Sequence, residues 1–104
     1  MELTITDANY EGIMAEGLPL VIDFSATWCG PCKMMSPIIA DVKAKIGDKA
    51  TIIKIDVDQN RELRLQYGIR SIPTLMIFKE GQLLWRDVGV HQSDELVALL
   101  ERFV

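Results

Sequence analysis

The chain has 104 residues, of which 49% are hydrophobic and 25% are charged, and its formal net charge at pH 7 is -4. This length and composition are typical of one globular domain, so we expect a single domain over residues 1–104. No cluster of lysine and arginine could neutralise a run of phosphates, which argues against nucleic acid as a partner. No apolar stretch approaches about 18 residues, so we expect no membrane-spanning segment.

The first residues, MELTITDANY, carry an acidic residue at Glu2 and lack the basic segment and apolar run of a secretory signal. We therefore expect a cytoplasmic protein. A leader removed beforehand would leave no trace in this sequence, so export stays open. Asp7 is expected to open a short first helix.

Strand patterns alternate with helix patterns along the chain, which favours an α/β domain. Residues 19–26, PLVIDFSA, form a nearly continuous apolar run, which is typical of a strand covered on both faces. Residues 51–58, TIIKIDVD, alternate apolar and polar side chains, which predicts a strand with one more polar face. Residues 73–78 and 82–90 follow as two strands, and the short KEGQ link between them predicts an antiparallel hairpin.

Three further helices are indicated by their periods and their ends. After the cysteines, apolar residues recur at helical spacing until Gly47, and Pro37 within this run is expected to kink the helix: Met35, Ile38, Val42 and Ile46. Asn60 is expected to cap a second helix that ends at Gly68. Ser93 is expected to cap the last helix, in which one apolar stripe recurs: Leu96, Leu99, Leu100 and Phe103.

Both cysteines of the chain lie in the stretch WCGPC, between the first buried strand and the helix that follows it. At the start of a helix, unpaired backbone N–H groups and the helix dipole favour a negative charge, so Cys29 should ionise readily to the thiolate. The thiolate is the nucleophile of disulfide exchange, and Cys32 lies one turn further on, where it could attack the resulting mixed disulfide. Pro31 suits the first helical turn because no N–H is needed there.

The cysteine pair has two other interpretations. A zinc site normally needs four ligands, and His91 is the one further typical nitrogen or sulfur ligand in the sequence. Alternatively, the cysteines could be an inert pair of small apolar side chains, but Trp28 and the strand-to-helix setting would then be a coincidence.

Taken together, WCGPCK, SIPTLMIF and FKEGQ resemble the thioredoxin family, and the match covers almost the whole chain. The resemblance implies a thioredoxin fold, with a central mixed sheet of four or five strands flanked by four helices. It implies a monomeric protein-disulfide reductase that cycles between dithiol and disulfide without metal or bound cofactor. Its partners would be disulfide-containing proteins as substrates and a thioredoxin reductase as electron donor.

The same resemblance assigns roles to residues near the cysteines. Cys29 would be the attacking thiol and Cys32 the resolving thiol, in a redox-active disulfide. The active-site loop would be completed by Trp28, Gly30 and Pro31.

Substrate binding is assigned by resemblance to Trp28 and to residues far along the chain. Pro73 is similar to the cis-proline that faces the disulfide in this family. The backbone of Ile72 would pair with an extended substrate segment, as in strand addition. Gly89 would keep the substrate groove open.

Asp23 lies within the first buried strand, where burial should raise the pKa of its carboxyl group. One interpretation is a hydrogen-bonded structural acid. The resemblance favours a general base for Cys32, acting through water, with Lys54 as its charged neighbour. Ser25 departs from the family, since many thioredoxins have a second tryptophan at this position, and a large side chain beside the active site is therefore missing.

Two alternative functions remain open from the sequence. A disulfide oxidase or isomerase of the same fold is one, although such relatives usually have histidine in place of Pro31. The other is a partner-binding subunit whose thiols are dispensable. Outside the motif, we expect His91 to be a surface or groove-edge residue with no catalytic task, because nothing around it in the sequence supplies a partner. Tyr67 and Trp85 are expected to serve in packing.

Overall fold

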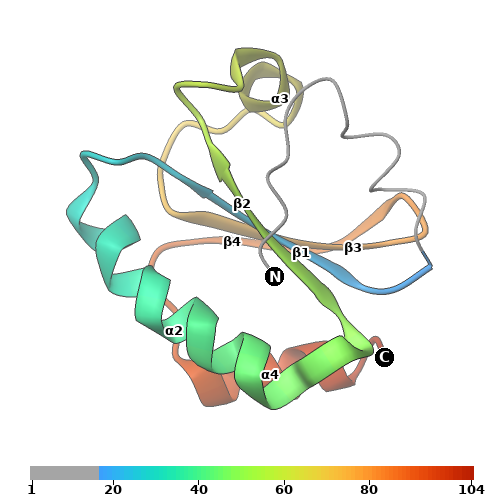
Figure 1. Ribbon diagram of the computed structural model, residues 1–104. Helices are drawn as coiled ribbons and strands as arrows, with labels where there is room; N and C mark the ends of the chain where they lie inside the picture. Colours follow the sequence, from blue (N-terminus) through green and yellow to red (C-terminus); the bar gives the residue numbers. More distant parts are fainter. Residues whose placement is uncertain (1–16) are drawn as a thin grey trace.

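The computed structural model describes residues 17–104, and the core of this part is a mixed sheet of four strands in the order β2-β1-β3-β4 (Figure 1). The strands are β1 (Leu20–Ser25), β2 (Thr51–Asp56), β3 (Thr74–Lys79) and β4 (Gln82–Val88). β1 runs parallel to β2 and antiparallel to β3, and β3 and β4 form an antiparallel pair. The expected mixed sheet and the expected hairpin are therefore confirmed.

Three α-helices flank the sheet in the described residues: α2 (Gly30–Ile46), α3 (Arg61–Gln66) and α4 (Ser93–Glu101). A short 3-10 helix, η1 (Gly47–Lys49), joins α2 to β2. Figure 1 shows α2 and α4 on one side of the sheet and α3 on the other. The first helix expected near Asp7 lies outside the described residues. Among the helices of residues 17–104, none is long and apolar enough to cross a membrane.

β1 is the central element because each of its faces belongs to a different hydrophobic cluster. All six residues of the strand are buried. Leu20, Ile22 and Phe24 point into the cluster that includes Leu63 of α3. Val21 points to the other face, into the cluster formed mainly by α2 and α4. Because side chains alternate along a strand, Asp23 lies on the α2 face as well. The prediction of a strand covered on both faces is confirmed.

α2 begins and ends as the sequence indicates. Ile38 is only partly buried. The buried residues after Cys32 recur at helical spacing: Met35, Ile39, Val42 and Ile46. Gly47 follows the helix with a φ of 62°, which a residue with a side chain rarely adopts, and its N–H donates to the carbonyl oxygen of Lys43. Pro37 lies inside this helix.

Of the two expected helix caps, Asn60 is confirmed in position and Ser93 is wrong. Asn60 occupies the N-cap position of α3, but its side chain makes no capping bond and instead donates to the carbonyl oxygen of Asp56 at 3.0 Å. α4 is preceded by Gln92 at the N-cap position, and Ser93 is the first helical residue. The hydroxyl group of Ser93 donates to the Asp41 carboxylate of α2, because the neighbouring helix offers a charged acceptor.

Candidate active site

Cys29 and Cys32 form a disulfide bond at the start of α2, with their Cα atoms 5.2 Å apart. Cys29 is the N-cap residue, and its Sγ atom accepts a hydrogen bond from the backbone N–H of Cys32 at 3.2 Å. In the reduced protein, a thiolate on Cys29 at this position would accept the same hydrogen bond from the N–H of Cys32. In the disulfide form both cysteines are buried, since Cys29 is only 5% exposed and Cys32 only 1%.

The loop before β3 covers the disulfide. The Ile72–Pro73 peptide bond is cis, as the resemblance implies, and Sγ of Cys29 lies 3.8 Å from the carbonyl oxygen of Ile72. The backbone N–H of Gly89, just after β4, donates to the carbonyl oxygen of Pro73 at 2.9 Å. Gly89 has a φ of 104°, which favours glycine at this position. One end of the sheet, where β1 ends and β3 begins, therefore brings together Cys29, Ile72, Pro73 and Gly89.

Trp28 lies beside the disulfide with 67% of its surface exposed. Its indole N–H donates to Oδ2 of Asp58 at 2.8 Å, and Oδ1 of Asp58 lies 3.8 Å from a guanidinium nitrogen of Arg64. Met34 of α2 is also largely exposed. The sequence did not reveal the role of Asp58, because its partner is 30 residues away and no local pattern connects them.

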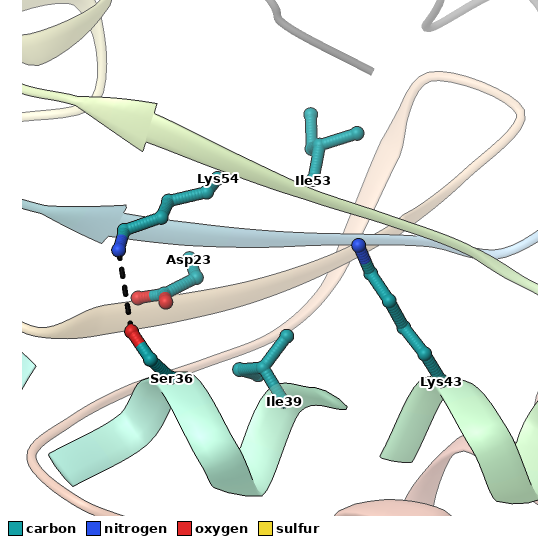
Figure 2. A pocket seen from close by; sticks show the side chains of 6 residues that line it. All are labelled: Asp23, Ser36, Ile39, Lys43, Ile53 and Lys54. Carbon is teal, nitrogen blue, oxygen red and sulfur yellow. Dashed lines mark hydrogen bonds between the residues drawn. The ribbon is translucent and has the colours of Figure 1, made fainter. Parts of the chain in front are cut away.

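Asp23 is only 1% exposed, and its Oδ1 atom has no hydrogen-bond partner among the described residues. Burial raises the pKa of this carboxyl group to about 6, although the positive charge of Lys54 opposes the rise. Asp23 and Lys54 line an open pocket of about 200 Å³ between the sheet and α2 (Figure 2). The other residues that line it are Ser36, Ile39, Lys43 and Ile53. Asp23 and Lys54 are therefore neighbours, as expected.

Ser25 is buried on β1, two residues after Asp23 and on the same face of the strand. Its hydroxyl oxygen has no hydrogen-bond partner among the described residues. In parallel register, Asp23 lies opposite Lys54 of β2 and Ser25 lies opposite Asp56. The ends of β1 and β2 near the disulfide therefore carry polar side chains.

His91 differs from the expectation of a residue without partners. Its Nδ1 atom lies 2.7 Å from Oε1 of Glu95, and its Nε2 atom lies 3.1 Å from Oδ2 of Asp87, at an angle that makes no hydrogen bond. The imidazole ring also meets the ring of Trp85 edge to face, with ring centres 5.3 Å apart. His91 thus links the end of β4 to the start of α4. The spacing of four residues to each acid was the signal in the sequence.

The aromatic residues expected to serve in packing do so. Tyr67 packs against Phe24 and Phe78, with ring centres 6.1 Å and 5.5 Å apart, and belongs to the cluster on the α3 side of the sheet. Trp85 packs against the cluster on the α2 and α4 side.

Comparison with known proteins agrees with this geometry. The family model described as Thioredoxin matches residues 2–102. A thioredoxin of Alicyclobacillus acidocaldarius is 41% identical over 98 residues, which cover 94% of this chain and 93% of the relative. A thioredoxin of Listeria monocytogenes is 41% identical over 96% of both chains, and one of Rickettsia bellii is 40% identical over 93% of both chains. With its Cys-Gly-Pro-Cys disulfide at a helix start, the chain belongs to the thioredoxin family of thiol–disulfide oxidoreductases.

Proposed function

We propose that this protein reduces the disulfide bonds of other proteins with Cys29 as the attacking thiol and Cys32 as the resolving thiol. The observation that carries the assignment is the position of Cys29 at the N-cap of α2, where its sulfur accepts the N–H of Cys32. That N–H and the positive end of the helix stabilise a thiolate on Cys29 but not one deeper in the helix.

The reaction consists of two exchanges in which electrons move through sulfur alone. The Cys29 thiolate attacks a substrate disulfide, a bond forms between Cys29 and one substrate sulfur, and the other substrate sulfur leaves as a thiolate that takes up a proton. Cys32 then loses its proton and attacks Sγ of Cys29. The Cys29–Cys32 disulfide forms, the bond to the substrate breaks, and the second substrate sulfur leaves as a thiolate that takes up a proton, so the substrate leaves with two thiols.

Asp23 is proposed as the base that accepts the proton of Cys32 through water, with Lys54 as its charged neighbour. A carboxyl group with a pKa of about 6 is mostly ionised at neutral pH and can still be protonated, which suits a proton acceptor. The pocket beside Asp23 supports a route for that proton to solvent.

We propose that the substrate binds to the loops that surround the disulfide. The exposed indole ring of Trp28 offers an apolar surface, and Gly30 and Pro31 complete the loop. The backbone of Ile72 next to Pro73 offers hydrogen-bonding groups to an extended substrate segment, and Gly89 leaves room on the other side because it has no side chain.

For the biological setting, we propose one domain over residues 1–104 that acts as a monomer in the cytoplasm. Its oxidised form would be reduced again by a thioredoxin reductase. The family membership supports these assignments, and Pro31 favours a reductase over an oxidase or isomerase.

The Cys32→Ser variant tests the two roles. It keeps the attacking thiolate and lacks the resolving thiol, so we expect it to accumulate a mixed disulfide with a small disulfide protein such as insulin. Non-reducing electrophoresis followed by mass spectrometry would detect the adduct, which dithiothreitol should release. The matched control is Cys29→Ser, which should form no adduct. Adducts formed by Cys29→Ser rather than by Cys32→Ser would contradict the proposal.

A further inference from the structure

A hydrogen bond between α2 and β2 lies at the pocket beside Asp23. The Nζ atom of Lys54 donates to the hydroxyl oxygen of Ser36 at 3.4 Å. Figure 2 shows the Ser36 side chain reaching up from α2 and the Lys54 side chain reaching toward it, with the Asp23 carboxyl group beside the bond. Lys54 does not occupy Oδ1 of Asp23, which has no partner among the described residues. The effect of Lys54 on Asp23 is therefore that of a nearby charge.

The electrostatic effect of Lys54 on Asp23 depends on the average distance between the ammonium group and the carboxyl group. Lys54 is exposed, and its four-carbon side chain is flexible, so a free ammonium group would sample positions in solvent far from the pocket. The interaction of two charges weakens with distance and with exposure to water. A group that holds Lys54 at the pocket therefore strengthens its effect on Asp23.

Among the described residues around Asp23, Ser36 is the one whose side chain accepts a hydrogen bond from Lys54. On β3, Leu75 lies opposite Asp23 and is apolar. On β2, the carboxyl oxygen Oδ1 of Asp56 already accepts the backbone N–H groups of Asp58 and Gln59. Lys43 of α2 is the second cation of the pocket, and Figure 2 shows it beyond Ile39, away from the bond of Lys54.

We propose that Ser36 is a positioning residue, whose hydroxyl group holds the Lys54 ammonium group beside Asp23. The inference rests on the proposed function in one respect, because it ascribes to Ser36 an influence on the proton transfer from Cys32. Its structural part, the link from Ser36 through Lys54 to Asp23, is independent of that function.

The test begins with Ser36→Ala in the oxidised protein, in which the disulfide-bonded cysteines do not titrate. The carboxyl carbon of Asp23 is followed by NMR from pH 4 to pH 9. Loss of the hydroxyl group should free Lys54 and raise the midpoint of the Asp23 titration by about 0.2 to 0.5 pH units, the scale of interactions between exposed charges. Ser36 is exposed on a helix, where alanine is well tolerated, so the variant should fold.

Two controls separate positioning from a general effect of the substitution. Ser36→Thr keeps the hydroxyl group and should restore the titration midpoint of the original protein. In a Lys54→Gln background, Ser36→Ala should leave the midpoint unchanged, because the charge that Ser36 holds is absent. An unchanged midpoint in Ser36→Ala, or a shift that persists without Lys54, would overturn the proposal.

Kinetics then distinguish this proposal from the role of Asp23 as a base. Resolution of the mixed disulfide is measured by acid quench and mass spectrometry. If Asp23 is the base, Ser36→Ala should resolve about twofold more slowly at pH 5, since fewer Asp23 groups are ionised, and equally fast at pH 8. A shifted Asp23 midpoint with unaltered resolution at pH 5 would support positioning by Ser36 and contradict the base role of Asp23.

Discussion

Asp23 combines a central position in the sheet with a carboxyl oxygen that has no hydrogen-bond partner in the described part of the chain. A buried acid of this kind opposes folding when it is charged, because ionisation requires the carboxylate to give up its hydration. The residue therefore lowers the free energy of unfolding at neutral pH. A cost of this type is common at functional sites and supports a role beyond structure.

Replacing Asp23 by asparagine should make the protein more stable at pH 8. The folded-state pKa is about 6 against 3.8 for the free group, so the penalty of ionisation appears as pH rises above 3.8 and levels off above 6. The advantage of Asp23→Asn in free energy of unfolding should therefore grow by about 2 kcal/mol between pH 4 and pH 8. Urea titrations of the oxidised proteins measure this difference.

The matched control for this substitution is Asp48→Asn, which replaces an exposed aspartate in η1. If the stability difference between Asp23→Asn and the original protein were independent of pH, Asp23 would not be a buried charge in solution.

At the scale of elements, the start of α2 decides the chemistry of the two thiols. Cys29 is placed before the first turn, where backbone N–H groups are unpaired, whereas Cys32 lies within that turn. Burial alone would not separate the two cysteines clearly, since both are largely covered in the disulfide form. The difference in their reactivity should therefore come mainly from the helix end.

Cys29 of the reduced protein should react with iodoacetamide at least about tenfold faster than Cys32 at pH 7, because its thiolate is the stabilised one. Limiting reagent followed by peptide mapping measures the ratio. Labelling in 6 M guanidinium chloride is the control, in which both cysteines should react alike since the helix is lost. Equal labelling of the folded protein would show that the end of α2 does not select between the thiols.

The elements were predicted more reliably from the sequence than the contacts between them. β1, α2 and the hairpin follow from apolar periods and from turn residues, which act locally. Contacts such as Trp28 with Asp58 join segments that are distant along the chain, so no local pattern indicates them. Ser93 shows the same limit, because its hydroxyl group bonds to another helix rather than to its own. The burial of Cys29 likewise depends on the distant loop at Ile72.

For the molecule as a whole, β1 joins the two hydrophobic clusters into one unit. Neighbouring residues of this strand, such as Val21 and Ile22, belong to opposite clusters. Loss of either cluster would uncover one face of the central strand. The two sides of the sheet should therefore unfold together in one cooperative transition.

Leu63→Ala tests this cooperativity from the α3 side. Leu63 is only 3% exposed, so its truncation should lower the free energy of unfolding by about 2 to 4 kcal/mol. Circular dichroism and tryptophan fluorescence should report the same shifted transition. Leu65→Ala is the matched control on the same helix, because Leu65 is 80% exposed and should matter little. Two separate transitions in Leu63→Ala would indicate that the faces of the sheet unfold independently.

The hairpin between β3 and β4 has a practical consequence for handling this protein. Its turn, at Glu80 and Gly81, lies at the end of the sheet away from the disulfide, because β3 runs antiparallel to β1 and ends beside Leu20, where β1 begins. Both turn residues are exposed. A dye or an affinity handle attached at this turn would leave the thiols facing away from it. The protein could therefore be attached to a bead or sensor surface through Glu80 while the loops around the Cys29–Cys32 pair stay accessible to the solution.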